Sequence, residues 1–398
     1  MKFFHLALLL ATLFSIVVPA SGVLPGDTSG NDHLEKPELS RLVLAALKDD
    51  QIVQDARDAA YVYIVWNGSP KRITDSSGKE RVIRRPLHRI VVLNSETLET
   101  MRSIGYDTTP VIGVDKFILQ KKEFFPEFAG TPGVGSIWAP DYEKIVSLQP
   151  DAVFLYATVS KSSGDAIEEK LATTSPEITV FRFDGYLPKT YSEEIRVLSD
   201  LLDCQATGRE FLDFYTTNID AVTSRSAEIP KEDRIRVYFE TWTDYKSCAA
   251  GSGYDQKITM AGGSNIFGDE TAEYPEIDPE AILKRSPQVV VKLVGAGKYI
   301  FGGYEGGANA SFQQVHRDII SRKGWESLPA VRDGRTYILH TDILGGPHFF
   351  IGVQYMAEWF YPEKFWDLDP ETVHAEYLSR FQGLNKKLND RQNFIYPV

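Results

Sequence analysis

Short apolar, β-branched runs separated by helical or loop sequence dominate the middle of this 398-residue chain. The first half contains RIVVLN, PVIGVD, DAVFLY and TVFRFDG, and the second half contains RVYFETW, QVVVKLVG and TYILHTD. Continuous apolar strands that alternate with helices are typical of parallel sheets covered by helices on both faces. The sequence therefore predicts an α/β protein with two Rossmann-like lobes, each built on a parallel sheet.

A long helical pattern separates the two series of strands. Residues 207–225 place the apolar side chains of Phe211, Tyr215, Ile219 and Val222 on one face. Such a helix would be roughly 30 Å long, about the width of a small domain. The expected organisation is an N-terminal lobe over 69–205, a connecting helix over 206–228, a C-terminal lobe over 229–345, and helices over 346–398 that pack back onto the lobes.

One helix-and-strand segment of the sequence occurs twice in the chain. PDYEKIVSLQPDAVF at 140–154 matches IDPEAILKRSPQVVV at 277–291 after a shift of 137 positions. The shift superposes Asp141 on Asp278, Glu143 on Glu280 and Pro150 on Pro287. In each copy an acid stands at a helix start, where a carboxylate opposes the helix dipole, and a proline ends the helix before the next strand. The repeat indicates that the same unit is used once in each lobe.

The N-terminus MKFFHLALLLATLFSIVVPASG has the layout of an export signal. Lys2 precedes an apolar run, and small residues near Ala20 provide a cleavage site, so residues 1–22 form the predicted signal. The run is shorter than the ~20 residues of a membrane span. We expect an exported protein at the periplasmic or extracellular face of the membrane, and anchoring by an uncleaved signal stays open.

The leader at 23–68 carries a pattern similar to a calcium loop followed by a helix. Oxygen ligands fall at loop positions one, three, five, seven and twelve, namely Asp27, Ser29, Asn31, the His33 carbonyl and Glu38. Asp32 replaces the glycine expected at position six. The pattern resembles one degenerate dockerin- or EF-hand-type half, and a solvated acidic linker before a helix is an equal alternative.

Net charge and cysteine content limit which partners and which cross-links the chain can have. The net charge of −12 argues against nucleic acid, which needs faces rich in lysine and arginine. Cys204 and Cys248 have no metal-ligand spacing. An exported protein can hold a disulfide, but we expect two separate thiols.

Four segments occur in an order and spacing known from one family: RIVVLNSETLETMRSIG, GVGSIWAPDYEKIVSLQPDAVF, YDQKITMAGGSNIFGD and IDPEAILKRSPQVVV. On these residues the chain resembles the substrate-binding proteins of iron-siderophore, haem and vitamin B12 ABC importers, over roughly residues 70–362. The resemblance implies the class III periplasmic-binding-protein fold, and we expect a monomer whose partner is a transmembrane permease. It also implies that Glu143 and Glu280 meet arginines of the permease, which is compatible with each glutamate stabilising its own helix.

In this fold the ligand lies between the lobes, against loops at the strand ends. The predicted contacts are Ser95, Glu96, Trp138, Tyr156 and Tyr186 from the N-terminal lobe, and Trp242, Tyr245, Tyr254, Tyr299, His340, Asp342 and His348 from the remainder. So many aromatic side chains suit a large, flat or apolar-edged ligand. Gly346-Pro347-His348 stands where related sequences often have Gly-Pro-Arg, which argues against a strongly anionic ligand.

The sequence thus predicts a receptor that captures an iron chelate of siderophore type and delivers it to an ABC permease. It would need no catalytic residue and no cofactor, because the metal arrives with the ligand. A receptor for a corrinoid, haem or a metal oxyanion is the alternative within transport. His340, Asp342 and His348 also leave open an exported metal-dependent enzyme. GAGK at 295–298 fails as a phosphate loop, because Lys292 and Tyr299 occupy two of its defining positions.

Overall fold

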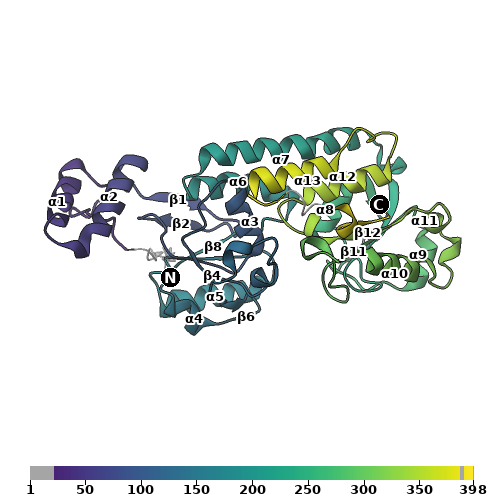
Figure 1. Ribbon diagram of the computed structural model, residues 1–398, viewed down its shortest axis with the longest axis horizontal. Helices are drawn as coiled ribbons and strands as arrows, with labels where there is room; N and C mark the ends of the chain where they lie inside the picture. The colour runs from purple at the N-terminus through teal and green to yellow at the C-terminus, as the bar shows by residue number, and fades with distance from the viewer. Residues whose placement is uncertain (1–21, 308, 386–389, 398) are drawn as a thin grey trace, which may run out of the picture.

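The computed structural model describes residues 22–307, 309–385 and 390–397. Residues 1–21 of the predicted export signal lie outside that range. Two α/β lobes stand next to each other, and one long helix runs along both of them (Figure 1). Within the described residues, no helix is long and apolar enough to cross a membrane.

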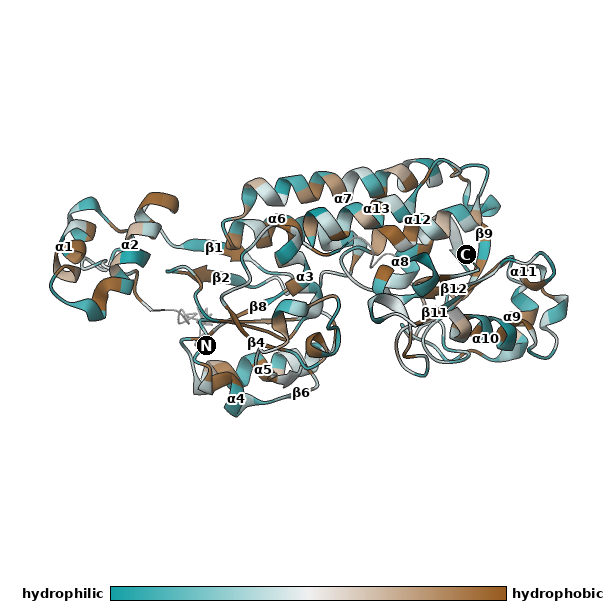
Figure 2. Cartoon of the chain, in the orientation of Figure 1, coloured by the Kyte–Doolittle hydropathy of each residue, from teal (hydrophilic) through white to brown (hydrophobic). Residues whose placement is uncertain are grey.

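The N-terminal lobe is built on a four-stranded parallel sheet in the order β4-β3-β7-β8. Its strands are β3 (Ile90–Val92), β4 (Val111–Val114), β7 (Ala152–Leu155) and β8 (Thr179–Arg182). Its helices are α3 (Ser95–Ser103), α4 (Tyr142–Ser147), α5 (Lys161–Thr174) and α6 (Pro188–Leu201), and a short ribbon pairs β5 (Gly135–Ser136) with β6 (Ala139–Pro140). Strands β3 and β7 are apolar and buried throughout because both faces of the sheet are covered (Figure 2), as predicted.

The C-terminal lobe has the sheet order β10-β9-β11-β12-β13. Four strands are parallel: β9 (Ile235–Glu240), β10 (Gly263–Asn265), β11 (Val289–Val294) and β12 (Thr336–His340). The helices are α8 (Gly253–Met260), α9 (Pro279–Arg285), α10 (Asn309–Ile320) and α11 (Pro329–Arg332).

The C-terminal segment corrects one expectation. Residues 346–398 do form α12 (Phe349–Phe360), α13 (Pro370–Glu376) and a π-helical turn at Tyr377–Phe381. They also return to the sheet as β13 (Ile395–Tyr396), which pairs antiparallel with β12. A strand of two residues has no alternating pattern, so hydropathy could not predict it.

The predicted connecting helix is α7 (Gln205–Ser226). Its buried face includes Phe211, Phe214 and Tyr215. The rings of Phe214 and Tyr215 lie edge-on to that of Phe350 on α12, each at 5.8 Å between centroids. The aromatic contact with a second long helix makes α7 part of a layer that runs along both lobes (Figure 1).

Both copies of the sequence repeat begin a helix in the same way. Asp141 caps α4 by accepting a hydrogen bond from the Lys144 N–H at 2.9 Å. Asp278 caps α9 by accepting one from the Glu280 N–H at 2.8 Å. The aligned aspartates are therefore N-caps in both lobes.

The end of the repeated unit is conserved in conformation as well. Gln149 and Ser286 each precede a proline and have left-handed backbones, with φ of 48° and 46°. The guanidinium of Arg89 donates to the Gln149 carbonyl at 3.1 Å, and that of Arg236 donates to the Ser286 carbonyl at 3.0 Å. Arg89 immediately precedes β3, and Arg236 lies within β9. In each lobe an arginine beside the strand thus satisfies the carbonyl exposed where the helix ends.

The leader consists of α1 (Lys36–Ala46), a 3-10 turn at Asp50–Ile52 and α2 (Val53–Val65), and it projects from the N-terminal lobe (Figure 1). Asn67 and Gly68 both adopt positive φ and end α2. A hairpin follows, formed by β1 (Lys71–Thr74) and β2 (Glu80–Ile83).

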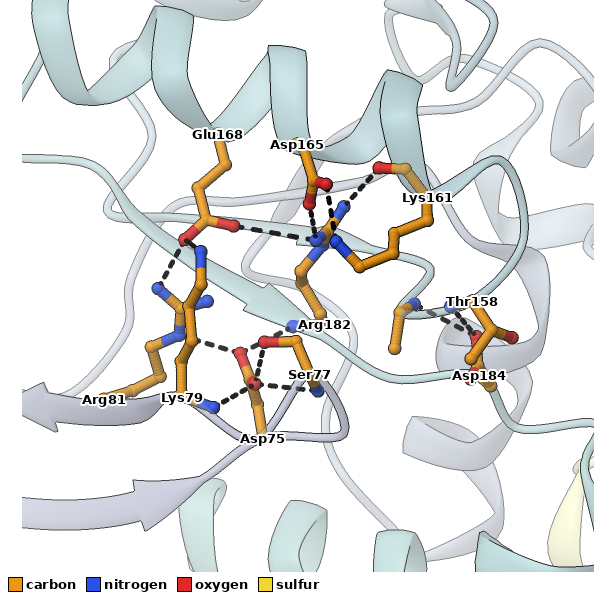
Figure 3. Close-up of polar contacts among 11 residues, drawn as sticks. Asp75, Ser77, Lys79, Arg81, Thr158, Lys161, Asp165, Glu168, Arg182 and Asp184 are labelled. Carbon is orange, nitrogen blue, oxygen red and sulfur yellow. Dashed lines mark hydrogen bonds and ion pairs between the residues drawn. The ribbon is translucent and has the colours of Figure 1, made fainter.

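Buried ion pairs fasten this hairpin to the lobe (Figure 3). Arg81 pairs with Asp75 at 2.7 Å and with Glu168 of α5 at 2.8 Å. Arg182 of β8 is fully buried and approaches the same Glu168 at 3.9 Å. A Cβ at Gly164 would stand 1.8 Å from the Arg182 guanidinium, so the arginine occupies space that only glycine leaves.

The two cysteines are free and far apart in the fold. Cys204 immediately precedes α7, and Cys248 is fully buried in the C-terminal lobe. Burial raises the pKa of both thiols, which opposes formation of the reactive thiolate. The expectation of two separate thiols is confirmed.

Candidate functional site

A cavity of about 200 Å³ lies between the lobes, beyond the carboxyl ends of the parallel strands. This is where open α/β sheets bind ligands. The cavity brings together the predicted residues Ser95, Glu96, Tyr156, Tyr186, Trp242, Tyr254, Asp342 and His348. It is completed by Glu99, Lys121, Phe124, Val159, Gly253, Lys257, Tyr274, Tyr304, Thr341, Gly345 and Gly346, which the sequence did not single out.

Four predicted contacts do not line this cavity. Trp138 is 57% exposed on the surface of the N-terminal lobe. Tyr245 and Tyr299 pack against the core of the C-terminal lobe. His340 is buried behind Asp342, whose backbone N–H it accepts through Nδ1 at 3.0 Å. The prediction treated every aromatic residue at a loop end as a cleft residue, whereas these side chains are held by their own lobe.

Aromatic rings form much of the cavity wall. Trp242 lies 5.5 Å from Tyr274 and 6.1 Å from Tyr254, and Phe124 stacks on Tyr304 at 4.5 Å between centroids. Burial raises the pKa of all three tyrosines, with that of Tyr254 reaching about 12. The hydroxyls therefore stay neutral at physiological pH, and those of Tyr254 and Tyr274 can act as hydrogen-bond donors to a ligand.

The buried carboxylate of Asp184 fixes the loop after β7 by hydrogen bonds to its backbone (Figure 3). Asp184 accepts hydrogen bonds from the backbone N–H groups of Ala157 and Thr158, at 3.0 and 2.9 Å. The Thr158 hydroxyl in turn lies 2.7 Å from the hydroxyl of Tyr186. These bonds hold Tyr186 and the residues beside Tyr156 at the mouth of the cleft.

A chain of buried polar side chains crosses from α3 to the C-terminal helices. Glu99 of α3 accepts a hydrogen bond from the Tyr377 hydroxyl and lies in contact with Nδ1 of His348. The Tyr304 hydroxyl lies 2.8 Å from Nε2 of His348 and 2.7 Å from Nε2 of His374. If Nδ1 of His348 donates to Glu99, its Nε2 accepts from Tyr304, and His374 donates to Tyr304. Oε1 of the Glu99 carboxylate is thereby hydrogen-bonded within the protein.

A second carboxylate on the wall is compensated by an ion pair. Asp342 lies 3.2 Å from the ammonium of Lys121 and accepts the Tyr304 N–H at 3.2 Å. Burial acts to raise the pKa of Asp342, but Lys121 and the ring of His340 outweigh it and hold the pKa at about 2. The pair joins a loop of the N-terminal lobe to one of the C-terminal lobe across the cleft.

Because its folded-state pKa is lowered from 3.8, Asp342 stabilises the fold above pH 4, and this contribution is lost as the pH falls towards 2. The loss is about 2 kcal/mol of unfolding free energy. Denaturant titrations from pH 5 to pH 2 should therefore show a steeper decline for the wild type than for Asp342→Asn. The exposed Asp318→Asn variant is the control and should follow the wild type. Parallel curves for Asp342→Asn and the wild type would contradict this assignment.

Lys257 of α8 is a buried amine on the cavity wall, 1% exposed. Its Nζ donates to the Leu344 carbonyl at 2.7 Å and lies 4.8 to 5.9 Å from the ring centroids of Phe349, Tyr254 and Tyr186. Burial lowers its pKa to about 7. A lysine within an ordinary amphipathic helix carries no sequence signal for this position, whereas Glu99 stands one turn after Glu96 and could have been found by helical spacing.

The residues of the predicted calcium loop have other partners. Asp27 accepts the backbone N–H groups of Gly30 and Asp32, and Glu38 accepts those of three loop residues. Asn31 accepts the His33 N–H, the His33 ring contacts Ser69, and the Ser29 hydroxyl donates to Asp27. Asp32 does take the left-handed turn expected at position six, with φ of 59°. Calcium binding stays a prediction.

No metal-ligand set forms around His340, Asp342 and His348. His348 faces Glu99 and Tyr304, and Asp342 faces Lys121. Across the part of the chain that the structure describes, no group of three or more histidine, cysteine, aspartate and glutamate side chains could hold a metal ion. The geometry therefore gives no support to the enzyme alternative that rested on these three residues.

Two α/β lobes, a connecting helix and an aromatic cleft between them define a two-lobed solute-binding protein. Residues 90–343 match the periplasmic binding protein family. The match covers more than half of the chain, so the chain belongs to this family, as an ABC-transporter substrate-binding protein of the class III fold. The leader at 23–68 lies outside the match.

The relatives of this chain are named for different ligands. The uncharacterized ABC transporter substrate-binding lipoprotein YvrC of Bacillus subtilis is 22% identical over 304 residues, 74% of this chain and 87% of that protein. A cobalamin-binding protein of Halobacterium salinarum is 28% identical over 56% of this chain and 58% of its own length, and the molybdate-binding protein MolA of Haemophilus influenzae is 20% identical over 79% and 92%. The chain thus spans less than two thirds of the cobalamin-binding relative.

The fold has solved counterparts. The TroA-like periplasmic binding protein FepB from Veillonella parvula superposes with a TM-score of 0.70 at 24% identity, over 79% of this chain and 97% of that one. The vitamin B12 binding protein BtuF of Vibrio cholerae gives a TM-score of 0.54 over 69% and 97%. The chain is a solute-binding receptor of the ABC-importer type, and its relatives do not agree on a ligand.

Proposed function

We propose that this receptor captures a metal chelate with flat or apolar faces and little net charge, an iron complex in the first place, and delivers it to an ABC permease outside the cytoplasm. The observation that carries the proposal is the composition of the cleft. Rings such as Trp242, Tyr254 and Tyr274 form its wall, and its carboxylates are largely satisfied by protein groups. Aromatic faces favour contact with the organic part of a chelate.

The charge balance of the cavity argues against polyanionic ligands. Its wall carries three carboxylates, those of Glu96, Glu99 and Asp342, against two ammonium groups, those of Lys121 and Lys257. None of the residues that line it is an arginine. A multiply charged oxyanion or a trianionic ferric chelate would meet a slightly negative surface, so molybdate is the least favoured of the ligand classes of the relatives.

The size of the cavity implies that the lobes move. Sites that enclose drug-sized ligands measure roughly 300–1,000 Å³, whereas this cavity measures about 200 Å³. A chelate of that size therefore requires the lobes to separate. The Lys121–Asp342 pair joins the lobes across the cleft and would have to lengthen in the open form.

A corrinoid is the second candidate because two of the relatives are a cobalamin-binding protein and a vitamin B12-binding protein. The two candidates separate in one titration series. Tryptophan fluorescence and calorimetry should be followed with a neutral ferric tris-hydroxamate chelate, haemin, cyanocobalamin and molybdate. We expect stoichiometric binding of one uncharged or weakly charged chelate and no binding of molybdate. Saturable binding of molybdate alone, or turnover of any bound chelate, would refute the proposal.

The permease contact is proposed on the pair Glu143 and Glu280. Both side chains are exposed in the first turn of a short helix, α4 in one lobe and α9 in the other. Neither helix lies alongside α7 (Figure 1). Since Asp141 and Asp278 already cap the two helices, the glutamates are free to meet a partner.

A further inference from the structure

The two lysines of the cleft differ in their surroundings. Lys121 pairs with Asp342 at 3.2 Å. Lys257 has no carboxylate within 4 Å among the described residues, and its one protein acceptor is the Leu344 carbonyl. An ammonium has three donors. Two N–H groups of a fully buried cation on the cavity wall are therefore available to whatever enters the cavity.

The surroundings of Lys257 are suited to recognise a single anion. Three aromatic rings, those of Tyr186, Tyr254 and Phe349, lie within 6 Å of its Nζ and attract the cation through their faces. This attraction stabilises the ammonium of Lys257, but the rings carry no negative charge that would neutralise it. A buried cation without a counter-ion is costly, and an anion from the ligand would relieve that cost.

Building on the proposed chelate function, we infer that Lys257 is the anion-recognition point of the cleft and pairs with one peripheral carboxylate, or an equivalent oxygen anion, of the bound chelate. The ligand class is thereby narrowed to a chelate with apolar faces and one such group. Glu96 restricts the number to one. The charge of its carboxylate raises the pKa of Lys257, and the carboxylate lines the same cavity. A second anion on the ligand would therefore be repelled by Glu96.

The test uses matched probes that differ only in carboxylates. The monomethyl ester of haemin is compared with the dimethyl ester, and the monocarboxylate of cyanocobalamin, in which one side-chain amide is hydrolysed, is compared with cyanocobalamin itself. The full chain, Lys257→Met and Lys257→Arg are titrated with each probe. Lys298→Met, at an exposed lysine that does not line the cavity, is the matched control.

For at least one pair, the wild type and the control should bind the carboxylate form on the order of ten-fold to a hundred-fold more tightly than its uncharged partner. Lys257→Met should bring this ratio close to one while keeping the affinity for the uncharged form, and Lys257→Arg should keep the preference. A merely structural lysine would lower both affinities together. An unchanged ratio in Lys257→Met would overturn the inference, whereas failure of every chelate to bind would overturn the proposed function itself.

A pH profile of the wild type gives a second readout that does not depend on a stable variant. The titratable groups that face Lys257 are Glu96 from α3, Tyr186 from the loop before α6 and Tyr254 from α8, and Lys121, Asp342 and His348 lie elsewhere on the wall. The tyrosines stay neutral from pH 6 to 8.5, because burial raises the pKa of both.

The affinity for the carboxylate probe should fall between pH 6 and 8.5 as the free amine loses its proton, and calorimetry in buffers of different ionisation enthalpy should show proton uptake on binding. The uncharged probe of each pair reports every effect of pH that does not act through the carboxylate. Equal pH profiles for the carboxylate probe and its uncharged partner would contradict the assignment.

Discussion

Reversing the charge at both Glu143 and Glu280 is expected to reduce chelate uptake by about 100-fold while leaving chelate affinity within two-fold of the wild type. The expected effect is large because a like-charge contact costs several kcal/mol at an interface, and the two lobes contribute one contact each. Each glutamate is exposed, has an aspartate beside it that caps the helix, and belongs to the unit that the chain repeats. The measurement is uptake of labelled chelate in cells that contain the cognate permease, together with a binding titration of the purified Glu143→Lys/Glu280→Lys protein.

The matched control places the same four-unit charge change elsewhere. Glu169 of α5 and Glu326 of the C-terminal lobe are exposed glutamates, one in each lobe. Glu169→Lys/Glu326→Lys should transport normally. Helix stability alone explains little, because a carboxylate in the first turn contributes about 0.3–1 kcal/mol. Normal uptake by Glu143→Lys/Glu280→Lys, or an equal loss in the control, would exclude the docking role.

Replacing Glu240 by glutamine is expected to lower the free energy of unfolding by about 3–5 kcal/mol. Glu240 is fully buried at the end of β9 and pairs with Lys292 at 2.9 Å and with Arg322 at 2.7 Å. It also accepts the hydroxyl hydrogen of Tyr238 at 2.9 Å. Burial acts to raise the pKa of Glu240, but the two cations outweigh it and keep the pKa low. Glutamine leaves Lys292, itself fully buried, with Asp244 at 3.7 Å as its remaining counter-charge, and Arg322 shares that aspartate at 3.2 Å.

The same substitution at a surface pair is the control. Glu270 lies 3.3 Å from Arg285 with 38% of its side chain exposed. Glu270→Gln should change stability by less than about 1 kcal/mol, as exposed ion pairs contribute little. Denaturant unfolding followed by circular dichroism measures both variants. A loss below 1 kcal/mol in Glu240→Gln would show that the buried cluster can reorganise, and the prediction would be wrong.

Local patterns predicted the scaffold accurately for physical reasons. Apolar runs such as DAVFLY became buried parallel strands, since a strand covered on both faces needs apolar residues throughout. The 207–225 pattern became α7 to within two residues. One cap differs from the pattern: Ser95 precedes the apolar stripe of Leu98 and Met101, where the sequence favours an N-cap, but Asn94 caps α3, because its side chain accepts the Thr97 N–H at 3.0 Å. Such shifts of one residue fall within the ambiguity of neighbouring cap residues.

The cleft was predicted less completely. Loop-end aromatics such as Trp242 and Tyr254 do reach it, but Tyr245 and Tyr299 have the same sequence context and pack into the C-terminal lobe. Glu99 owes its position to Tyr377, 278 residues later in the chain. No short segment of the sequence contains both residues, so the hydrogen-bond network beside the cavity could not be predicted from the sequence around either of them.

The sequence by itself determined the two-lobed α/β fold, the long helix and the repeated unit with an acid at each helix start, because periodicity and helix-end signals express interactions between near neighbours in the chain. The tertiary structure alone decided which side chains meet in the cleft. In the folded protein Lys121 pairs with Asp342, whereas Lys257 contacts only a backbone carbonyl and has no paired carboxylate among the described residues. The charge and proton affinity of an ionisable group depend on burial and on partners distant in sequence, and only the packing of the two lobes sets these.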